Sequence, residues 1–186
     1  SGAFPVDSGS NNARRDMPDV DFLFGIGPQL IFKLINEPGA RKLNFNLQAR
    51  AVYSRDFSSI DHRGYVFNPK LNYTREHVTG LDLKVFTSMG PIFATEKLMD
   101  YFYQVDPEFV TSTRPAYDAD AGYLGSNMTL GVSKRFNSRF RLMLGTRLGI
   151  HSGATNDDSP LFKDELNVSV FSAFIWSFYQ SEELAR

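Results

Sequence analysis

The chain has 186 residues, 42% of them hydrophobic and 14% aromatic, and a formal net charge of −1 at pH 7. A chain this close to neutral gives no electrostatic footprint for nucleic acid, and its zero cysteines exclude disulfides and thiolate metal sites. No apolar run reaches the ~18 residues of a transmembrane helix, so a helical membrane span is excluded. The length allows one or at most two domains.

The first segment, residues 1–19, is rich in Gly, Ser, Asn and Pro and shows no signal-peptide pattern. Its composition predicts a loop. We expect either that a leader has been removed or that the chain is a fragment of a longer protein.

Residues 20–34 show a two-residue alternation. Odd positions are mostly polar or glycine, whereas the even positions hold apolar side chains: Phe22, Phe24, Ile26, Pro28, Leu30, Phe32 and Leu34. This period is that of a β-strand with one apolar and one polar face.

The same period recurs in six later segments: 43–54, 64–73, 80–93, 122–136, 139–151 and 165–179. At about 3.3 Å per residue, most of them are longer than the roughly 9–11 residues that a tilted strand needs to cross a bilayer. Aromatic residues gather near several strand ends, as they do at membrane interfaces. Long strands with one wet face predict an antiparallel transmembrane β-barrel. A soluble sandwich or a lipocalin-like barrel is the alternative.

The predicted connections differ in length. Four are short or moderate, at 35–41, 57–63, 76–79 and 137–138, and two are long, at 94–121 and 152–164. Outer-membrane barrels have short periplasmic turns and long outer loops, so we expect residues 1–19 outside, the barrel at 20–179, and a periplasmic tail at 180–186. Seven strands is an odd number, whereas bacterial barrels use even numbers. N-terminal strands are therefore expected to be missing from a barrel of roughly ten or more strands.

Charged residues on the polar faces are the candidates for a barrel lumen. They are Arg50, Lys70, Asp82, Lys84, Lys134, Arg139, Arg141 and Arg147. Bases outnumber acids in this set. Either the bases pair with acids on missing strands and plug the barrel, or they line a narrow pore that favours anions or polar solutes.

A catalytic interpretation has one candidate pair, His151 and Ser152, with Asp157 and Asp158 nearby in sequence. An outer-membrane esterase or lipid A deacylase would use such residues. Neighbours in sequence rarely point toward one another, so we expect no enzyme activity.

Metal binding has little support in the sequence. His62 and His77 fall in connections expected on opposite sides of the membrane, and Asp118 and Asp120 fall in a solvated loop. No cofactor or metal is expected.

Four stretches carry a family resemblance: RRDMPDVDFLFGIGPQ at 14–29, YFYQVDP at 101–107, RPAYDADAGY at 114–123 and DDSPLF at 157–162. Together they resemble the MipA/OmpV family, the MltA-interacting outer-membrane proteins of Gram-negative bacteria. The motif residues of the long loop are Tyr101, Phe102, Tyr103, Val105, Pro107, Arg114, Pro115 and Tyr117. Several are too apolar for a free loop tip, so we expect the loop to fold back over the barrel mouth or to present an adhesive patch.

The resemblance implies a non-enzymatic protein integral to the outer membrane, in contact with its lipid, which bridges a murein hydrolase and a murein synthase. Some members are associated with adhesion or antibiotic susceptibility. The turns 35–41 and 76–79 and the tail 180–186 would then carry the enzyme contacts. Two departures stand out: Gln104 replaces a usual Gly, and the chain continues past Phe178 and Tyr179, where family chains tend to end.

Overall fold

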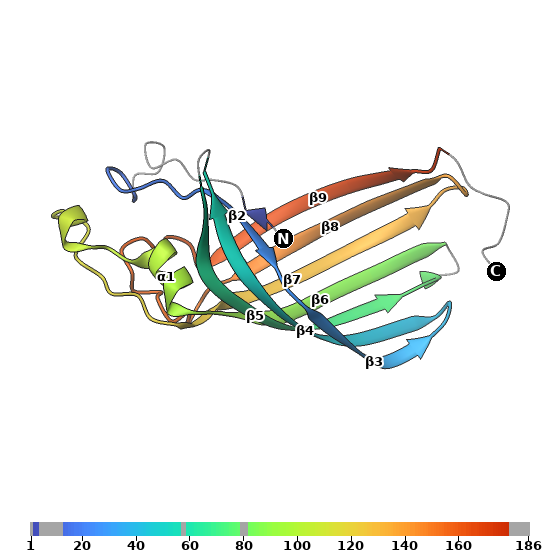
Figure 1. The fold of residues 1–186 in the computed structure, drawn as a ribbon. Coiled ribbons are helices and arrows are strands. Elements are labelled where there is room, and N and C mark those ends of the chain that lie inside the picture. The colour runs from blue at the N-terminus through green and yellow to red at the C-terminus, as the bar shows by residue number, and fades with distance from the viewer. Residues whose placement is uncertain (1, 4–12, 57–58, 79–81, 179–186) are drawn as a thin grey trace.

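The computed structural model describes residues 2–3, 13–56, 59–78 and 82–178. Most of them form one curled antiparallel sheet, an open half-barrel (Figure 1). The strands are β1 (Gly2–Ala3), β2 (Phe22–Ile26), β3 (Gln29–Glu37), β4 (Arg41–Arg55), β5 (Ile60–Arg75), β6 (Leu83–Ala94), β7 (Gly122–Arg135), β8 (Phe140–Ile150) and β9 (Leu166–Trp176). Their order is β1-β2-β4-β5-β6-β7-β8-β9, with β3 also paired to β4. The predicted all-β antiparallel fold is confirmed.

The first predicted strand is in fact two strands. β2 and β3 pair with successive parts of β4 and are separated at Gly27 and Pro28. Pro28 has no N–H to donate, and it accepts a hydrogen bond from the Ala49 N–H at 3.2 Å. A side chain at Gly27 would place its Cβ 2.0 Å from the Ala49 oxygen, so this close approach requires glycine.

The connections lie at two opposite ends of the sheet, because consecutive strands are antiparallel, and the two longest, 95–121 and 151–165, lie at the same end. We call one end the short-turn end; its connections are 38–40, 76–82 and 136–139. The other, the long-loop end, holds 13–21, 56–59, 95–121 and 151–165. Several strands extend beyond their predicted limits: β3 continues to Glu37 and β5 begins at Ile60, which shortens the adjoining connections.

The connection 95–121 contains two helices that sequence patterning missed. They are α1 (Glu96–Tyr103) and the 3₁₀-helix η2 (Pro107–Phe109). Thr95 precedes α1 in an extended conformation, and Pro107 occupies the first position of η2, where its missing N–H costs nothing. Within the described ranges, neither helix has the length and apolar character needed to cross a bilayer.

The register places polar and apolar side chains in separate rows across the sheet. One row on the convex face is wholly apolar: Phe32, Phe45, Leu71, Met89, Met128, Leu148 and Val168. The adjacent row on the concave face is wholly polar: Lys33, Asn44, Asn72, Ser88, Thr129, Arg147 and Ser169. In these two rows the apolar side chains point outward and the polar ones inward; in other rows the concave face also holds Phe86, Met143, Phe171 and Ile175.

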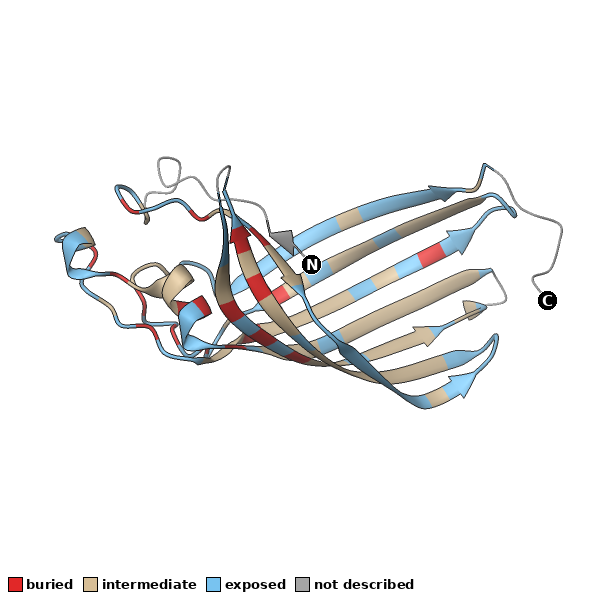
Figure 2. Ribbon diagram, viewed as in Figure 1, coloured by how far each residue is buried: buried red, intermediate tan, exposed pale blue. Residues whose placement is uncertain are grey.

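Burial is concentrated at the long-loop end, where β2, β4 and β5 meet α1 (Figure 2). Elsewhere most strand residues are intermediate or exposed. The exposed large hydrophobics include Leu71, Met89, Leu130, Val170 and Phe174, all on the convex face.

The ladder between β5 and β6 is interrupted near its middle. Phe67 pairs with Phe93 and Leu71 with Met89, and this register sets Pro69 opposite Pro91. Neither proline has an N–H to give to the ladder. The Asn68 side chain donates to the Pro91 carbonyl at 2.6 Å and so replaces one of the missing backbone N–H donors.

Gly64 lies beside a β-bulge between β4 and β5, where α1 comes closest to the sheet. Its φ is +125°, and a Cβ there would lie 2.5 Å from the Thr95 Oγ1 and 3.1 Å from the Leu98 N. Gly64→Ala is therefore expected to destabilise the packing of α1 by about 1–3 kcal/mol. Hydrogen exchange of the α1 amides measures this.

Gly25→Ala is the matched control for that variant. Its φ is not positive, and its new Cβ would make only ordinary contacts, the nearest at 3.6 Å. Equal exchange rates in the two variants would contradict the close approach of α1 to Gly64.

Candidate functional site

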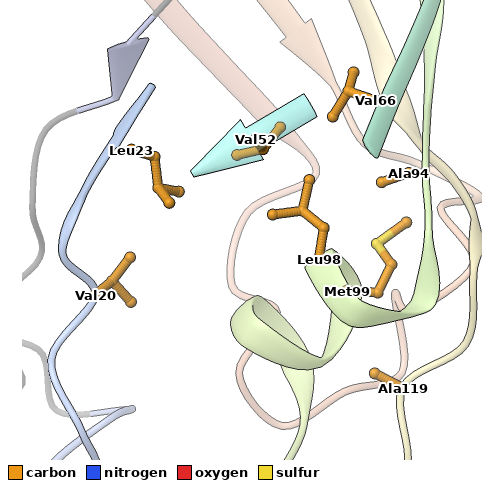
Figure 3. Packing of buried hydrophobic residues seen from close by; sticks show 8 residues of the cluster. All are labelled: Val20, Leu23, Val52, Val66, Ala94, Leu98, Met99 and Ala119. Carbon is orange, nitrogen blue, oxygen red and sulfur yellow. The ribbon is translucent and has the colours of Figure 1, made fainter. Parts of the chain in front are cut away.

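The long-loop end is closed by a cap, which we define as residues 13–21, 95–121 and 151–165. Its apolar core joins the cap to the concave face of the sheet (Figure 3). The core residues are Val20, Leu23, Val52, Val66, Ala94, Leu98, Met99 and Ala119. The long loop thus folds back onto the sheet, with α1 as the element that contacts β5.

The aromatic motif residues of α1 tie the cap segments together. The Tyr101 hydroxyl accepts from the Asp21 N–H at 2.8 Å and donates to the Asp21 Oδ2 at 3.1 Å. The Arg63 guanidinium lies over the Tyr101 ring at 4.3 Å. The Phe102 carbonyl accepts from Arg14, and the Tyr103 carbonyl accepts from Ser159.

Gln104 and Val105 bring the two motif stretches together. Val105 is 1% exposed and bridges with Tyr117 in an antiparallel pair. Gln104 has a φ of −62°, which needs no glycine, and its Oε1 accepts from the Ala119 N–H at 3.0 Å. The departure from Gly at this position is therefore accommodated by a side-chain contact.

Arg114 is the most heavily bonded motif residue. It is 7% exposed, and its guanidinium donates twice to the Phe109 carbonyl and once each to the Ala13 and Arg15 carbonyls. It thereby joins the N-terminal segment to the motif loop. The next residue, Pro115, is exposed, and Pro107 opens η2.

Tyr117 connects the motif loop to the loop 151–165. Its hydroxyl lies 2.6 Å from the Asp158 Oδ1 and 3.2 Å from the Asn156 Oδ1. Burial and the nearby Asp158 carboxylate raise the pKa of Tyr117, because a phenolate there would face a second negative charge. The fully buried Asn156 also accepts from the Asp120 N–H.

Cap stability is expected to fall at high pH because of Tyr117. The pKa of Tyr117 in the folded protein lies above the ordinary value of about 10. The stabilisation of the cap by the protonated Tyr117 hydroxyl is therefore fully present below pH ~10 and is lost as the pH rises further. Tyr117→Phe should cost about 1 kcal/mol at neutral pH and flatten this alkaline loss. The rate of proteolysis of the cap between pH 8 and 11 measures this alkaline loss of stability. An unchanged pH profile in Tyr117→Phe would contradict the assignment of the loss to Tyr117.

A second feature of the cap is a hollow of about 510 Å³ between the N-terminal segment and α1. Its charged lining comprises Arg14, Asp19, Asp21, Arg63, Lys97, Asp100 and Asp106. Burial and the neighbouring carboxylates of Glu96, Asp118 and Asp106 raise the pKa of Asp100. Both signs of charge are present.

Seven of the eight predicted lumen residues divide into two groups. Arg50, Lys70, Lys84, Arg141 and Arg147 occupy concave positions of the strands. Asp82 and Arg139 lie in turns at the short-turn end instead.

Lys134 departs from its predicted inward direction. It pairs with Leu83 and Leu142 on the convex face, and its ammonium lies 5.3 Å from the centre of the Phe136 ring. The alternation of β7 itself gives this direction, since Lys134 shares parity with Leu130 and Val132.

Two residues of the catalytic hypothesis, His151 and Asp158, have different partners. His151 Nδ1 lies 2.8 Å from the Leu124 carbonyl, and the His151 ring lies against Phe162. Asp158 is bonded to Tyr117. The geometry thus gives each of these side chains a structural contact within the cap.

The two other histidines lie at opposite ends of the sheet. His62 is in β5 between the rings of Tyr53 and Tyr65, and His77 is at the short-turn end, 3.7 Å from Asp82. In the part of the chain that the structure describes, no three His, Asp or Glu side chains are grouped as a metal site.

Aromatic rings form a belt at each end of the convex face. At the long-loop end Phe24 stacks on Tyr53, and Phe93 lies beside Tyr123. The belt of the short-turn end consists of Phe136, Phe140 and Trp176, with neighbouring centroids 5.5 and 5.8 Å apart.

Sequence patterning missed three residues that hold the cap: Arg63, Gly64 and Asn156. Glycine within a strand pattern is a signal for a bulge or a close approach, so Gly64 could have been found. Arg63 is the extra residue of that bulge, and it donates to the Ser54 Oγ at 2.7 Å. The Asn156 side chain bonds to Tyr117 and Asp120, which lie far away in sequence.

Comparison with known proteins gives one family. A family model described as "MltA-interacting protein MipA" matches residues 1–178. No curated protein and no solved structure matches the chain.

Proposed function

Because the chain belongs to the MltA-interacting protein MipA family, we propose that it is an integral outer-membrane β-barrel protein and a non-enzymatic scaffold for murein enzymes. Its partners would be a murein hydrolase of the MltA type and a murein synthase. The hydrolase is inferred from the family name, and the synthase from the resemblance to the MipA/OmpV family.

The separation of apolar and polar rows between the two faces is the observation that carries the membrane assignment. A soluble half-barrel would bury apolar side chains inside the curl, whereas this sheet exposes them outside; Met89, for example, is 55% exposed. A lipid-facing exterior with a polar interior is the pattern of outer-membrane barrels. The aromatic belts support the same assignment, since such barrels carry aromatic girdles at both interfaces.

The spacing of the belts fits a bilayer. The path from Tyr123 in β7 to Phe136 just after it is roughly 43 Å of extended chain, or about 33 Å of height at the ~40° tilt common in such barrels. This is close to the hydrocarbon thickness of about 30 Å.

Closure of the barrel would satisfy the outer edges of β3 and β9, which pair with no further strand among the described residues. Open edges do not persist in lipid, because their N–H and C=O groups would have no partners. Additional strands, making ten or more in total, would join these edges.

The scaffold contact is assigned to the short-turn end, which would face the periplasm. Hollows of about 180 and 300 Å³ lie there, the first lined by Glu76, His77 and Asp82 and the second by Arg139. The turns themselves are short, so the enzyme would bind the charged rim rather than an extended loop.

The test is capture of a purified MltA-type murein hydrolase by the full-length protein folded in detergent. Reversal of rim charges, with Asp82→Lys and Arg139→Glu, should weaken capture at least about tenfold. Lys163→Glu, exposed on the cap at the opposite end, is the control and should bind as the parent does. If Asp82→Lys and Arg139→Glu captured the hydrolase as well as Lys163→Glu does, the proposal that the enzyme binds the charged rim would be wrong.

A narrow pore is the second candidate, favoured by the polar concave face. The cap lies over one mouth, so any pore would pass between cap and strands. Planar-bilayer conductance of the folded full-length protein tests it. Discrete current steps would support the pore, and a folded but silent barrel would leave the scaffold.

A further inference from the structure

The hollow of about 300 Å³ at the short-turn end is lined by hydrogen-bond donors and by no acid. It lies where the turn between β7 and β8 meets the end of β9 (Figure 1). Its polar lining residues are Arg135, Asn137, Ser138, Arg139, Arg141 and Ser177. The three arginines carry a permanent positive charge, and each of the other side chains can donate a hydrogen bond. The hollow therefore offers a set of donors to a negatively charged group.

Two of the arginines face each other across neighbouring strands. Arg135 and Arg141 are register partners in β7 and β8, which places their Cα atoms about 4.5–5.5 Å apart. Both lie on the concave face, because their neighbours in sequence, Lys134 and Leu142, form a convex pair. Like charges directly opposite each other destabilise a ladder. An anion bound beside the pair would offset this repulsion.

The turn between β7 and β8 holds the third arginine at the same hollow. The Asn137 Oδ1 accepts from the Arg139 N–H at 2.9 Å and from the Phe140 N–H at 2.8 Å. The Arg139 carbonyl accepts from the Ser177 N–H at 2.9 Å, which ties the end of β9 to the turn. Both bonds of the Asn137 side chain use its oxygen, so its amide nitrogen is left to donate.

The acids near these arginines already have other basic partners. A neighbouring hollow of about 180 Å³ shares Arg135 and Arg141 and contains two acids, Glu76 and Asp82. Glu76 lies within 4.0 Å of two lysines, and Asp82 lies 3.7 Å from a histidine. In the part of the chain that the structure describes, none of the three arginines makes an ion pair. Their positive charge is thus available to a ligand.

We propose that Arg135, Arg139 and Arg141 form a binding site for a phosphate group at the short-turn end of the sheet. Each guanidinium presents N–H donors in a planar fork that matches the oxygens of a phosphate. A small phosphorylated solute and a lipid headgroup share this chemistry, and the experiment below distinguishes them. The inference goes beyond the scaffold role, because it needs only the folded sheet and not the capture of a hydrolase.

The experiment measures the binding of inorganic phosphate to the full-length protein folded in a maltoside detergent without phospholipid. Equilibrium dialysis is done at constant ionic strength with chloride as the balancing ion. Arg139→Gln and Arg141→Gln should each raise the Kd about tenfold or more, since each removes one charged donor group. Arg141→Lys keeps the charge but loses the fork, so its Kd should lie between those of the parent and Arg141→Gln.

Lys134→Gln is the matched control. Lys134 is an exposed base next to Arg135 in sequence, but it lies on the convex face and does not line the hollow. Its substitution should leave the Kd unchanged. If Lys134→Gln weakened binding as much as Arg141→Gln, phosphate would be attracted by the general charge of this end, and the site would be wrong. Heat-modifiable gel mobility checks that every variant is folded.

Phosphatidylglycerol added to the micelles separates the two sources of the phosphate group. Competition with inorganic phosphate would show that a lipid headgroup enters the site, and an unchanged Kd would show that the ligand is a solute from water. Either outcome supports a phosphate site.

The chain itself has two acids close in sequence to the hollow, Glu182 and Glu183, which follow Ser177 by five and six residues. Changing both to Gln tests whether they are the natural partners of the arginines. An unchanged Kd for phosphate supports an external ligand. A Kd about tenfold lower would assign the arginines to the carboxylates of the chain and overturn the proposal.

The outcomes for this site and for the scaffold can be told apart in one preparation. A folded protein that captures the hydrolase but shows no saturable phosphate binding would overturn this site alone. A protein that binds phosphate but not the hydrolase would overturn the scaffold alone. A protein that stays folded and soluble without detergent would instead overturn the membrane assignment.

Discussion

Met89→Arg is expected to prevent stable insertion of the protein into lipid vesicles, whereas Ser88→Arg inserts as the parent does. The two positions are adjacent in β6, but Met89 lies in the apolar convex row and Ser88 in the polar concave row. An arginine on the lipid face near the middle of the bilayer costs about 2–4 kcal/mol, and one in the lumen has access to water. Heat-modifiable gel mobility gives the fraction of folded protein at each urea concentration. The stability difference between the two variants follows directly from these fractions.

The pair also separates a membrane barrel from a soluble sheet. Met89 is 55% exposed, so in water an arginine there would be tolerated at least as well as one at Ser88. Equal insertion by the two variants, or a greater loss for Ser88→Arg, would count against a lipid-facing convex surface.

Arg114→Met is expected to detach the cap while leaving the strands folded. The substitution removes four hydrogen bonds and leaves the carbonyls of Phe109, Ala13 and Arg15 without their donor, at a local cost of about 3–5 kcal/mol. Limited proteolysis of 95–121 should become much faster, and the heat-modifiable mobility of the barrel should persist.

Two controls sharpen this second result. Arg114→Lys keeps the charge but loses the planar fork, so an intermediate rate is expected. Lys163→Met removes an exposed charge of the same cap and should cleave at the parental rate. If Arg114→Met were as resistant as Lys163→Met, Arg114 would not be the residue that holds the N-terminal segment to the motif loop.

The strands could be predicted from sequence because their period depends on local information. An apolar side chain at every second position requires only that one face meet an apolar environment, so the faces of β4, β6 and β8 follow directly from the alternation. The pairing of β3 with β4, β4 with β5, β5 with β6 and β7 with β8 then follows from short connections.

Bulges could not be predicted, since they depend on two strands at once. By the alternation of 122–136, Leu124 shares parity with Met128 and Leu130 and would point outward, but the irregularity where Ile92 pairs with Gly125 and Phe93 with Tyr123 turns it toward the core of the cap. One extra residue reverses the direction of a side chain without any change in the surrounding composition.

The contacts of the cap could not be predicted from sequence for a related reason. Arg114 bonds to Ala13 and Arg15, and Tyr101 bonds to Asp21, across separations that no local pattern records. The family motifs indicated that these residues matter, and the structure shows that they hold three distant segments together.

The facing prolines of β5 and β6 determine where the sheet would begin to separate. Pro69 and Pro91 remove two donors from the same part of one seam, and the Asn68 side chain restores only a single bond to the Pro91 carbonyl. Mechanical unzipping of a folded single molecule should therefore pause or start at this seam, well away from the free margins of the sheet. The sheet is therefore expected to separate first between β5 and β6, in its middle.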